Sequence, residues 1–184
     1  MSSLKPIVSE LPVFDRKFWD GTFRCTQIGS GAIGGKASGL VFIQDLLAKQ
    51  IDHANPSDVE INVPTMAVIA TDCFDDFIAQ NNLGDLRFDE MSDDRIGHAF
   101  QKSELPFELL GDLRALIVQV KSPLAIRSSS LLEDALERPF AGVYATKMIP
   151  NNQPDPDTRF RRLVEAIKFV YASTYFREAR DYIR

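Results

Sequence analysis

The chain has 184 residues, of which 45% are hydrophobic and 26% are charged, a composition typical of a soluble globular protein with one core. Its net charge of -5 excludes the basic footprint that general nucleic-acid binding requires. No apolar run approaches the roughly 18 residues that cross a bilayer, and residues 1–14 lack the apolar core of a signal peptide. We therefore expect a cytoplasmic protein with neither a nucleic acid nor a membrane as a partner.

The periodicity of the apolar residues predicts both strands and helices. Strands are expected over 23–28, 61–70, 124–126 and 143–149. Helices are expected over 36–50, from Thr71 or Asp72 as N-cap through Ile78, over 106–120 and, as one long helix, over 158–184. Residues 81–103 are polar and ambiguous.

These elements divide the chain into an irregular lead-in over 1–22, a body over 23–150, and a linker with the long helix over 151–184. We expect an α+β fold, with a small sheet of mixed direction flanked by helices. Basic residues outnumber acidic ones seven to three over 159–184, so this segment carries +4 and the remainder -9. We interpret it as a solvated helix face, and a basic docking surface is the alternative. No glycine cap or proline stop ends this helix, so we expect the natural chain to continue beyond it.

The two cysteines, Cys25 and Cys73, are far apart in the sequence and belong to no CxxC pair or His-rich cluster. In a reducing cytoplasm such residues are usually thiols and not a disulfide. We therefore predict two free thiols and no cysteine metal site.

The segment 29–35 holds four glycines in seven residues, which favours unusual backbone angles over regular structure. It matches the G-x-G-x-x-G fingerprint, with Asp52 at about the expected distance, so a dinucleotide-binding domain is one alternative. The Walker A pattern fails, because Ala37 follows Lys36 where a magnesium-binding hydroxyl is required. A third interpretation is a phosphate site at a helix N-terminus, with Lys36 as a mobile positive charge. A glycine connector with a solvated lysine is the structural alternative.

The most informative stretch is 122–150, in which a short apolar run leads to Arg127 and three serines. A guanidinium forks onto two oxygens of an anion, and neighbouring hydroxyls bind others. The serines could equally cap the following turn, and the acidic pair Glu133 and Asp134 could mark an exposed helix start. Gly142 suits a loop that needs close backbone approach.

Three motifs, in this order, resemble the N-terminal ATP-binding domain of phosphoenolpyruvate synthases and pyruvate phosphate dikinases. They are Gly34-Gly35-Lys36-Ala37-Ser38-Gly39-Leu40, then Val63-Pro64 leading to Thr71 and a helix with Phe74 and Phe77, and then the Arg-Ser-Ser…Glu-Asp…Phe-Ala-Gly segment over 127–142. The resemblance covers about residues 25–150. It implies the N-terminal half of an ATP-grasp domain and a kinase, that is, a transferase that moves phosphate from ATP to a histidine on another domain.

The resemblance also implies roles for single residues. Lys36 and Arg127 correspond to the lysine and arginine that bind the nucleotide phosphates in the family. Weaker candidates for the same site are Gly34, Gly35, Ser128, Ser129, Glu133, Asp134 and Gly142. The implied cofactors are ATP and Mg²⁺, with the metal ligands expected mainly outside this chain.

The chain departs from the family pattern, because the second ATP-grasp subdomain, the phosphohistidine domain and the pyruvate-binding barrel have no counterpart in it. His53 and His98 match no phosphocarrier motif, so no catalytic residue is expected within this chain. We expect a nucleotide-binding part that needs other domains of a longer polypeptide and is inactive alone. The alternative is a non-catalytic module that senses nucleotide or docks to a partner, with a homo-oligomer covering its unfinished side. The residues do not specify the phosphate acceptor.

Overall fold

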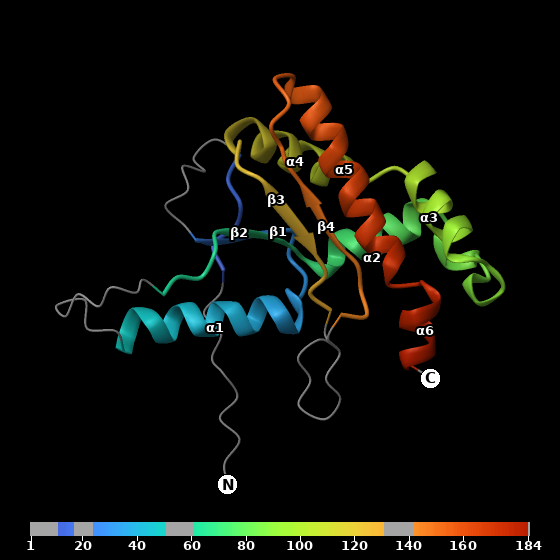
Figure 1. Ribbon diagram of the computed structural model, residues 1–184, viewed down its shortest axis with the longest axis horizontal. Helices are drawn as coiled ribbons and strands as arrows, with labels where there is room; N and C mark the ends of the chain where they lie inside the picture. Colours follow the sequence, from blue (N-terminus) through green and yellow to red (C-terminus); the bar gives the residue numbers. More distant parts are fainter. Residues whose placement is uncertain (1–10, 17–23, 51–60, 131–141, 184) are drawn as a thin grey trace, which may run out of the picture.

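The computed structural model describes residues 11–16, 24–50, 61–130 and 142–183, and it has the mixed α and β fold that the sequence predicts (Figure 1). Strand β1 (Cys25–Ile28) pairs in parallel with β2 (Met66–Ile69). Strand β3 (Leu124–Arg127) pairs antiparallel with β4 (Thr146–Ile149). Both strand directions that we expected are therefore present, in two separate pairs.

The helices flank these strand pairs. They are α1 (Gly34–Gln50), α2 (Thr71–Gln80), α3 (Asp93–Lys102), α4 (Phe107–Gln119), α5 (Pro156–Ser173) and α6 (Arg177–Ile183). The ambiguous segment 81–103 folds as two short 3-10 turns, η1 (Leu83–Asp85) and η2 (Phe88–Glu90), followed by α3. Among the residues described, no helix has the length and apolar character that a membrane crossing requires.

Strands β1 and β2 form a parallel pair, and helix α1 lies between them in the chain. The register sets Cys25 opposite Met66 and runs to the ends of both strands. On the other edge of β1, Val13 forms a parallel bridge with Gln27, and the neighbouring Phe14 is buried. The described part of the lead-in is thus fixed against β1.

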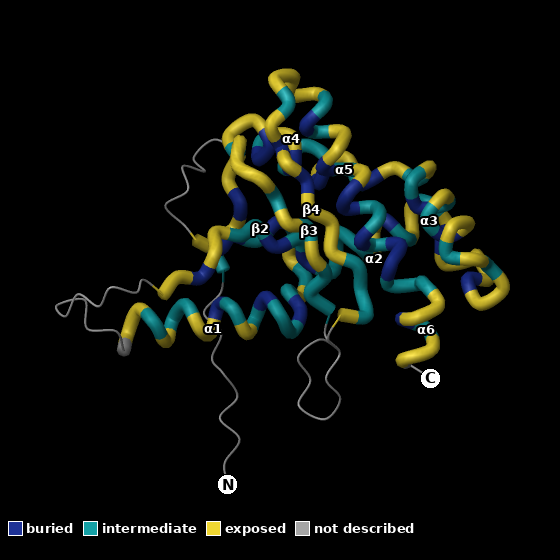
Figure 2. The backbone as a smooth tube through the Cα atoms, in the orientation of Figure 1, coloured by how far each residue is buried: buried dark blue, intermediate teal, exposed yellow. Residues whose placement is uncertain are grey.

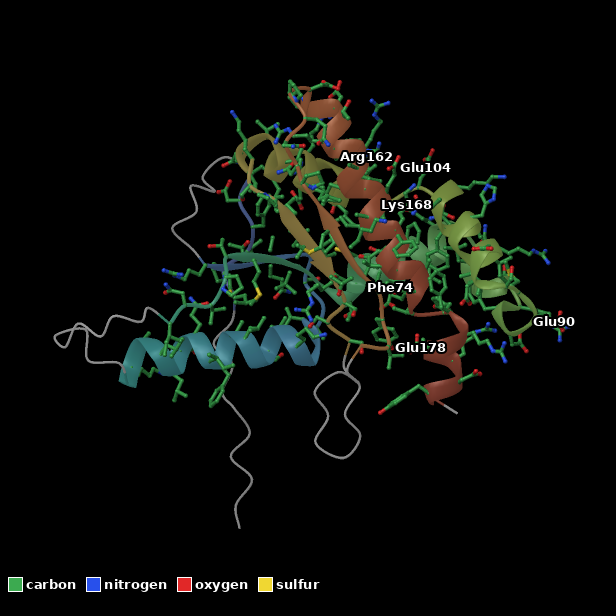
Figure 3. All side chains as sticks on the ribbon, viewed as in Figure 1. Phe74, Glu90, Glu104, Arg162, Lys168 and Glu178 are labelled. Carbon is green, nitrogen blue, oxygen red and sulfur yellow. The ribbon has the colours of Figure 1, made fainter. Side chains whose placement is uncertain are left out.

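A cluster of aromatic rings lies between α2, α3 and α5, within a core that also contains aliphatic side chains of α4 and α5. The ring centroids of Phe77 and Phe100 are 5.7 Å apart, and Phe74 meets Tyr171 of α5 edge-on at 4.8 Å. Figure 3 shows Phe74 beside α5, and Figure 2 shows buried positions gathered where these helices meet. Such ring pairs add stability beyond the burial of their area.

The single helix predicted over 158–184 is wrong, because two helices, α5 and α6, occupy this segment. Ser173 and Thr174 at the break donate their hydroxyl hydrogens to backbone carbonyls three residues earlier, at 2.6 and 2.7 Å. Such side-chain bonds compete with the helical hydrogen-bond ladder. After the break, the backbone N–H of Arg177 donates to Asp93 Oδ1 at 2.8 Å, which joins α6 to the start of α3.

Three basic side chains of α5 and α6 donate to backbone carbonyls at the ends of earlier helices. Arg159, which is only 4% exposed, reaches two carbonyls at the end of α4, at 2.8 and 3.0 Å. Lys168 reaches two at the end of α3, at 2.9 and 2.8 Å, and Figure 3 shows it where α5 faces α3. Arg180 donates to carbonyls at η2. The interpretation as a solvated face is therefore wrong for these three residues, since they satisfy helix C-termini.

We predict that Arg159→Met lowers the free energy of unfolding by about 1–3 kcal/mol, because the buried Ile117 carbonyl loses its side-chain donor and the Val120 carbonyl keeps only that of Asn151. Urea denaturation followed by circular dichroism measures this change. Arg162→Met on the same helix is the control. Its side chain is 64% exposed and pairs with Glu165 at 3.5 Å, so the expected change is below about 0.5 kcal/mol. Equal losses in both variants would contradict the capping role of Arg159.

Candidate functional site

The glycine motif forms the loop after β1 and the first turn of α1. Gly34, the first residue of α1, has a φ angle of +77°, which glycine adopts readily and other residues rarely. A Cβ atom at this position would lie 1.4 Å from the backbone oxygen of Ser129. Lys36 follows in the same turn and is half-buried. Figure 1 shows this end of α1 next to the carboxyl end of β3.

The glycine motif and the serine segment are hydrogen-bonded to each other, although 92 residues separate their bonded positions in the sequence. The N–H of Gly35 donates to the oxygen of Ser130 at 2.9 Å, and the N–H of Ala37 donates to Ser129 Oγ at 2.8 Å. The Ser129 hydroxyl donates in turn to the oxygen of Ile33 at 2.8 Å. Ser129 therefore holds both ends of the first turn of α1.

Arg127 is the last residue of β3, and its side chain is exposed. Its register partner in β4 is Thr146, and directly opposed residues share one face of a strand pair. The other face of this pair packs on α5. Within the described ranges, the Arg127 guanidinium has neither an ion-pair partner nor a side-chain hydrogen bond.

Of the remaining predicted site residues, the structure describes Ser128 and Gly142. Ser128 is half-buried and lies between Arg127 and Ser129. Gly142 has a φ angle of +80° and open space where a Cβ would stand. Glu133 and Asp134 lie outside the described residues. In the part of the chain that the structure describes, no group of three or more His, Cys, Asp or Glu side chains could hold a metal ion.

Sequence reasoning missed the contact between the glycine loop and the N-terminus of α2. The predicted N-cap, Thr71 or Asp72, is wrong, because the N-cap is Ala70 and it makes no side-chain cap. Thr71 Oγ1 instead accepts the N–H of Ala32 at 3.1 Å. Asp72 Oδ2 accepts the N–H and the hydroxyl of Ser30, at 2.7 and 2.9 Å. The sequence did contain a signal for this contact. The glycine loop follows β1 and these two residues follow β2, and the carboxyl ends of parallel strands lie at the same edge of a sheet.

The contacts at the start of α2 shift two pKa values in opposite directions. Burial on its own raises the pKa of the Asp72 carboxyl, but hydrogen bonds from Ser30 and nearby backbone N–H groups outweigh it, so the pKa lies below its ordinary value of 3.8. Burial and the Asp72 charge raise the pKa of the Cys73 thiol to about 11. Cys73 is therefore protonated at neutral pH, and only a thiolate is a good nucleophile.

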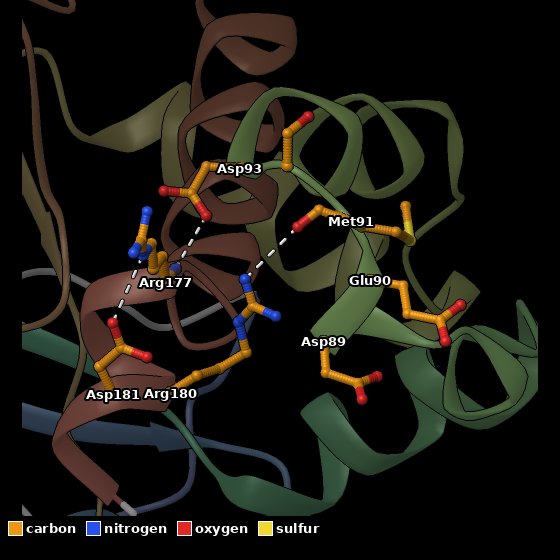
Figure 4. A pocket seen from close by; sticks show the side chains of 8 residues that line it. Asp89, Glu90, Met91, Asp93, Arg177, Arg180 and Asp181 are labelled. Atoms are coloured by element: carbon orange, nitrogen blue, oxygen red, sulfur yellow. Dashed lines mark hydrogen bonds and ion pairs between the residues drawn. The ribbon is translucent and has the colours of Figure 1, made fainter.

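A pocket of about 590 Å³ lies elsewhere, between η2, the start of α3 and α6 (Figure 4). Four carboxylates and two guanidinium groups line it, and none of the predicted ATP-binding residues does. Arg177 pairs with Asp181 at 3.5 Å, and Arg180 donates to the Met91 oxygen at 3.4 Å. Because the lining has a net negative charge, its field disfavours a polyphosphate.

The glycine loop, the first turn of α1 with Lys36, and the strand end with Arg127 lie together in one α+β domain. The family model "Pyruvate phosphate dikinase, AMP/ATP-binding domain" matches residues 30–184. The chain belongs to this family, and the predicted resemblance and the predicted class of nucleotide-binding domain are confirmed. No curated protein and no solved structure was found to match the chain.

We predict that Gly34→Ala lowers the free energy of unfolding by at least about 2 kcal/mol, because a positive φ and a backbone clash oppose the added Cβ. Gly39→Ala is the matched control on the same helix, where nothing lies within 4 Å of the added Cβ. It should raise stability by about 0.5–1 kcal/mol, since alanine favours a helix interior. Thermal and urea unfolding measure both changes, and a Gly34→Ala variant as stable as the parent would contradict the contact with Ser129.

We predict that the stabilisation from Asp72 depends on pH. Because its pKa is lowered in the folded state, the carboxylate stabilises the fold above its unfolded pKa, and this stabilisation disappears as the pH falls through the folded pKa. The difference in unfolding free energy between the parent and Asp72→Asn should therefore shrink between about pH 5 and pH 2. Urea denaturation of both proteins at several pH values measures it, and a constant difference would count against the assignment.

Proposed function

We propose that this chain binds the phosphates of ATP where the glycine motif meets the serine segment, through Lys36 and Arg127. The observation that carries this proposal is the set of hydrogen bonds between the two motifs, from Gly35 to Ser130 and from Ala37 to Ser129. These bonds link a lysine on a helix to an arginine at a strand end. The family match over 30–184 supports ATP as the nucleotide.

The two positive side chains have complementary chemistry. Lys36 supplies a compact mobile charge, and Arg127 supplies a planar fork that fits two phosphate oxygens. Phosphoryl transfer requires mainly the positioning of phosphates and the compensation of developing negative charge. Because Ser129 and Ser130 already bind the N–H groups of α1, the side chains and the helix dipole, and not those N–H groups, are expected to hold the phosphates.

Further parts of the proposal come from the family. The domain is the N-terminal part of an ATP-grasp-like kinase, a transferase that passes phosphate to a histidine on another domain in the cytoplasm. Glu133 and Asp134 are the candidates in this chain to approach Mg²⁺, which would offset phosphate charge, and other acidic ligands come from outside it. His98 is exposed on α3 and has no role in this transfer. The chain alone is therefore expected to bind nucleotide without completing the reaction.

One observation favours the alternative of a docking module or homo-oligomer. Helix α1 exposes Phe42, Ile43 and Leu46 on one side, with 48%, 44% and 38% of their surfaces accessible. Adjacent exposed apolar side chains are typical of protein interfaces. The docking surface that we considered over 159–184 has less support, because three of its basic residues bind internal carbonyls.

We predict that the chain binds ATP with Mg²⁺, and that Arg127→Gln and Lys36→Gln each weaken binding by about tenfold or more, as expected for the loss of a charged hydrogen bond. Isothermal titration calorimetry measures the affinities, with circular dichroism to confirm folding.

The control for this experiment is Lys147→Gln, which removes the same charge from the neighbouring strand. Lys147 is opposite Ile126 in the register, on the other face from Arg127, and its Nζ lies 5.2 Å from the Phe169 ring centroid. Its loss should leave ATP affinity unchanged. A folded parent that binds no ATP, or a control as weak as Arg127→Gln, would sink the proposed site.

A further inference from the structure

We propose that Asp72 is the positioning residue of the glycine loop, so that its carboxylate, through Ser30, sets the place of Lys36. This inference rests on the proposed function of Lys36 in ATP binding. It gives a role to the Thr-Asp pair at the start of α2, which the phosphate contacts do not use.

The glycine loop and the first turn of α2 are joined by reciprocal hydrogen bonds. Asp72 Oδ2 accepts both donors of Ser30, at 2.7 and 2.9 Å. Ala32 donates its N–H to Thr71 Oγ1 at 3.1 Å, and its oxygen accepts the N–H of Thr71 at 3.0 Å. The two bonds to the carboxylate are charge-assisted and so are stronger than neutral ones. Lys36 follows Ala32 by four residues and lies in the first turn of α1.

The close approach of α2 also explains the first two glycines of the motif. A Cβ at Gly29 would lie 2.6 Å from Asp72 Oδ1 and 2.7 Å from Cys73 Sγ. A Cβ at Gly31 would lie 2.6 Å from both the Asp72 nitrogen and Thr71 Oγ1. These glycines therefore leave space for the first turn of α2. The dinucleotide-binding alternative would instead explain them by the close approach of a pyrophosphate.

The loop has two anchors, and they differ in what they fix. The serine segment holds its end through Gly35 and Ala37, and α2 holds its beginning through Ser30 and Ala32. Without Asp72, the serine anchor still holds the first turn of α1, while the chain that leads into it becomes looser. The expected consequence is a less ordered Lys36 in a folded protein.

The test measures ATP affinity by calorimetry in the presence of Mg²⁺ for the parent, Asp72→Ala and Asp72→Asn. Asp72→Ala should bind roughly tenfold more weakly, because two charge-assisted hydrogen bonds that order the loop are lost. Asp72→Asn should keep most of the affinity, since its amide oxygen still accepts the Ser30 N–H. Asp76→Ala removes an exposed carboxylate from the same helix and should leave the affinity unchanged.

A double variant separates positioning from a general loss of structure. If Asp72 acts through Lys36, then Asp72→Ala should weaken ATP binding much less in a Lys36→Gln background than in the parent. Equal losses in both backgrounds, or no loss in Asp72→Ala, would overturn the inference while the proposed function stands. A folded parent without ATP binding would overturn the proposed function itself, and the inference with it.

Discussion

The hydroxyl group of Ser129 accepts the N–H of Ala37 and donates to the oxygen of Ile33, and the candidate site depends on this pair of hydrogen bonds. They tie the first turn of α1 to the segment that follows β3. Lys36 lies inside this turn, and Arg127 lies two residues before Ser129. The Ser129 side chain therefore fixes the position of the segment that carries Lys36 relative to the segment that carries Arg127. Gly34 makes the contact possible, because no other residue leaves space for the Ser129 backbone.

A second constraint lies in the positive charges of α5 and α6. Helix C-termini leave carbonyl oxygens without helical partners, and α3 and α4 both end against α5. Arg159 and Lys168 satisfy these oxygens from inside the protein. Burial lowers the pKa of Lys168, which is the cost of placing an ammonium group there. Helices α3 and α4 are thus fixed at their C-terminal ends as well as along their packed faces.

The sequence was sufficient to predict most of the strands and helices and to select Lys36 and Arg127 as candidates, because glycine density, apolar periodicity and an arginine at the end of an apolar run are local signals. It was not sufficient for Thr71 and Asp72, since a Thr-Asp pair before a helix looks the same whether it caps that helix or binds a distant loop. The break after Ser173 was missed for a related reason. Neither proline nor glycine marks it, and the hydroxyls that compete with the helix are ordinary helix residues elsewhere.

The rings of Phe77, Phe100, Tyr171 and Tyr175 are fixed against one another in the core, whereas residues 29–37 and 127–130 contain no aromatic side chain. Near-ultraviolet circular dichroism arises from aromatic groups held in a fixed tertiary environment. The contribution of these rings therefore reports the packing of α2 and α3 against α5 and the turn that follows it, and it does not come from the glycine loop. A variant of the loop can lose its ligand while its aromatic spectrum stays that of the parent.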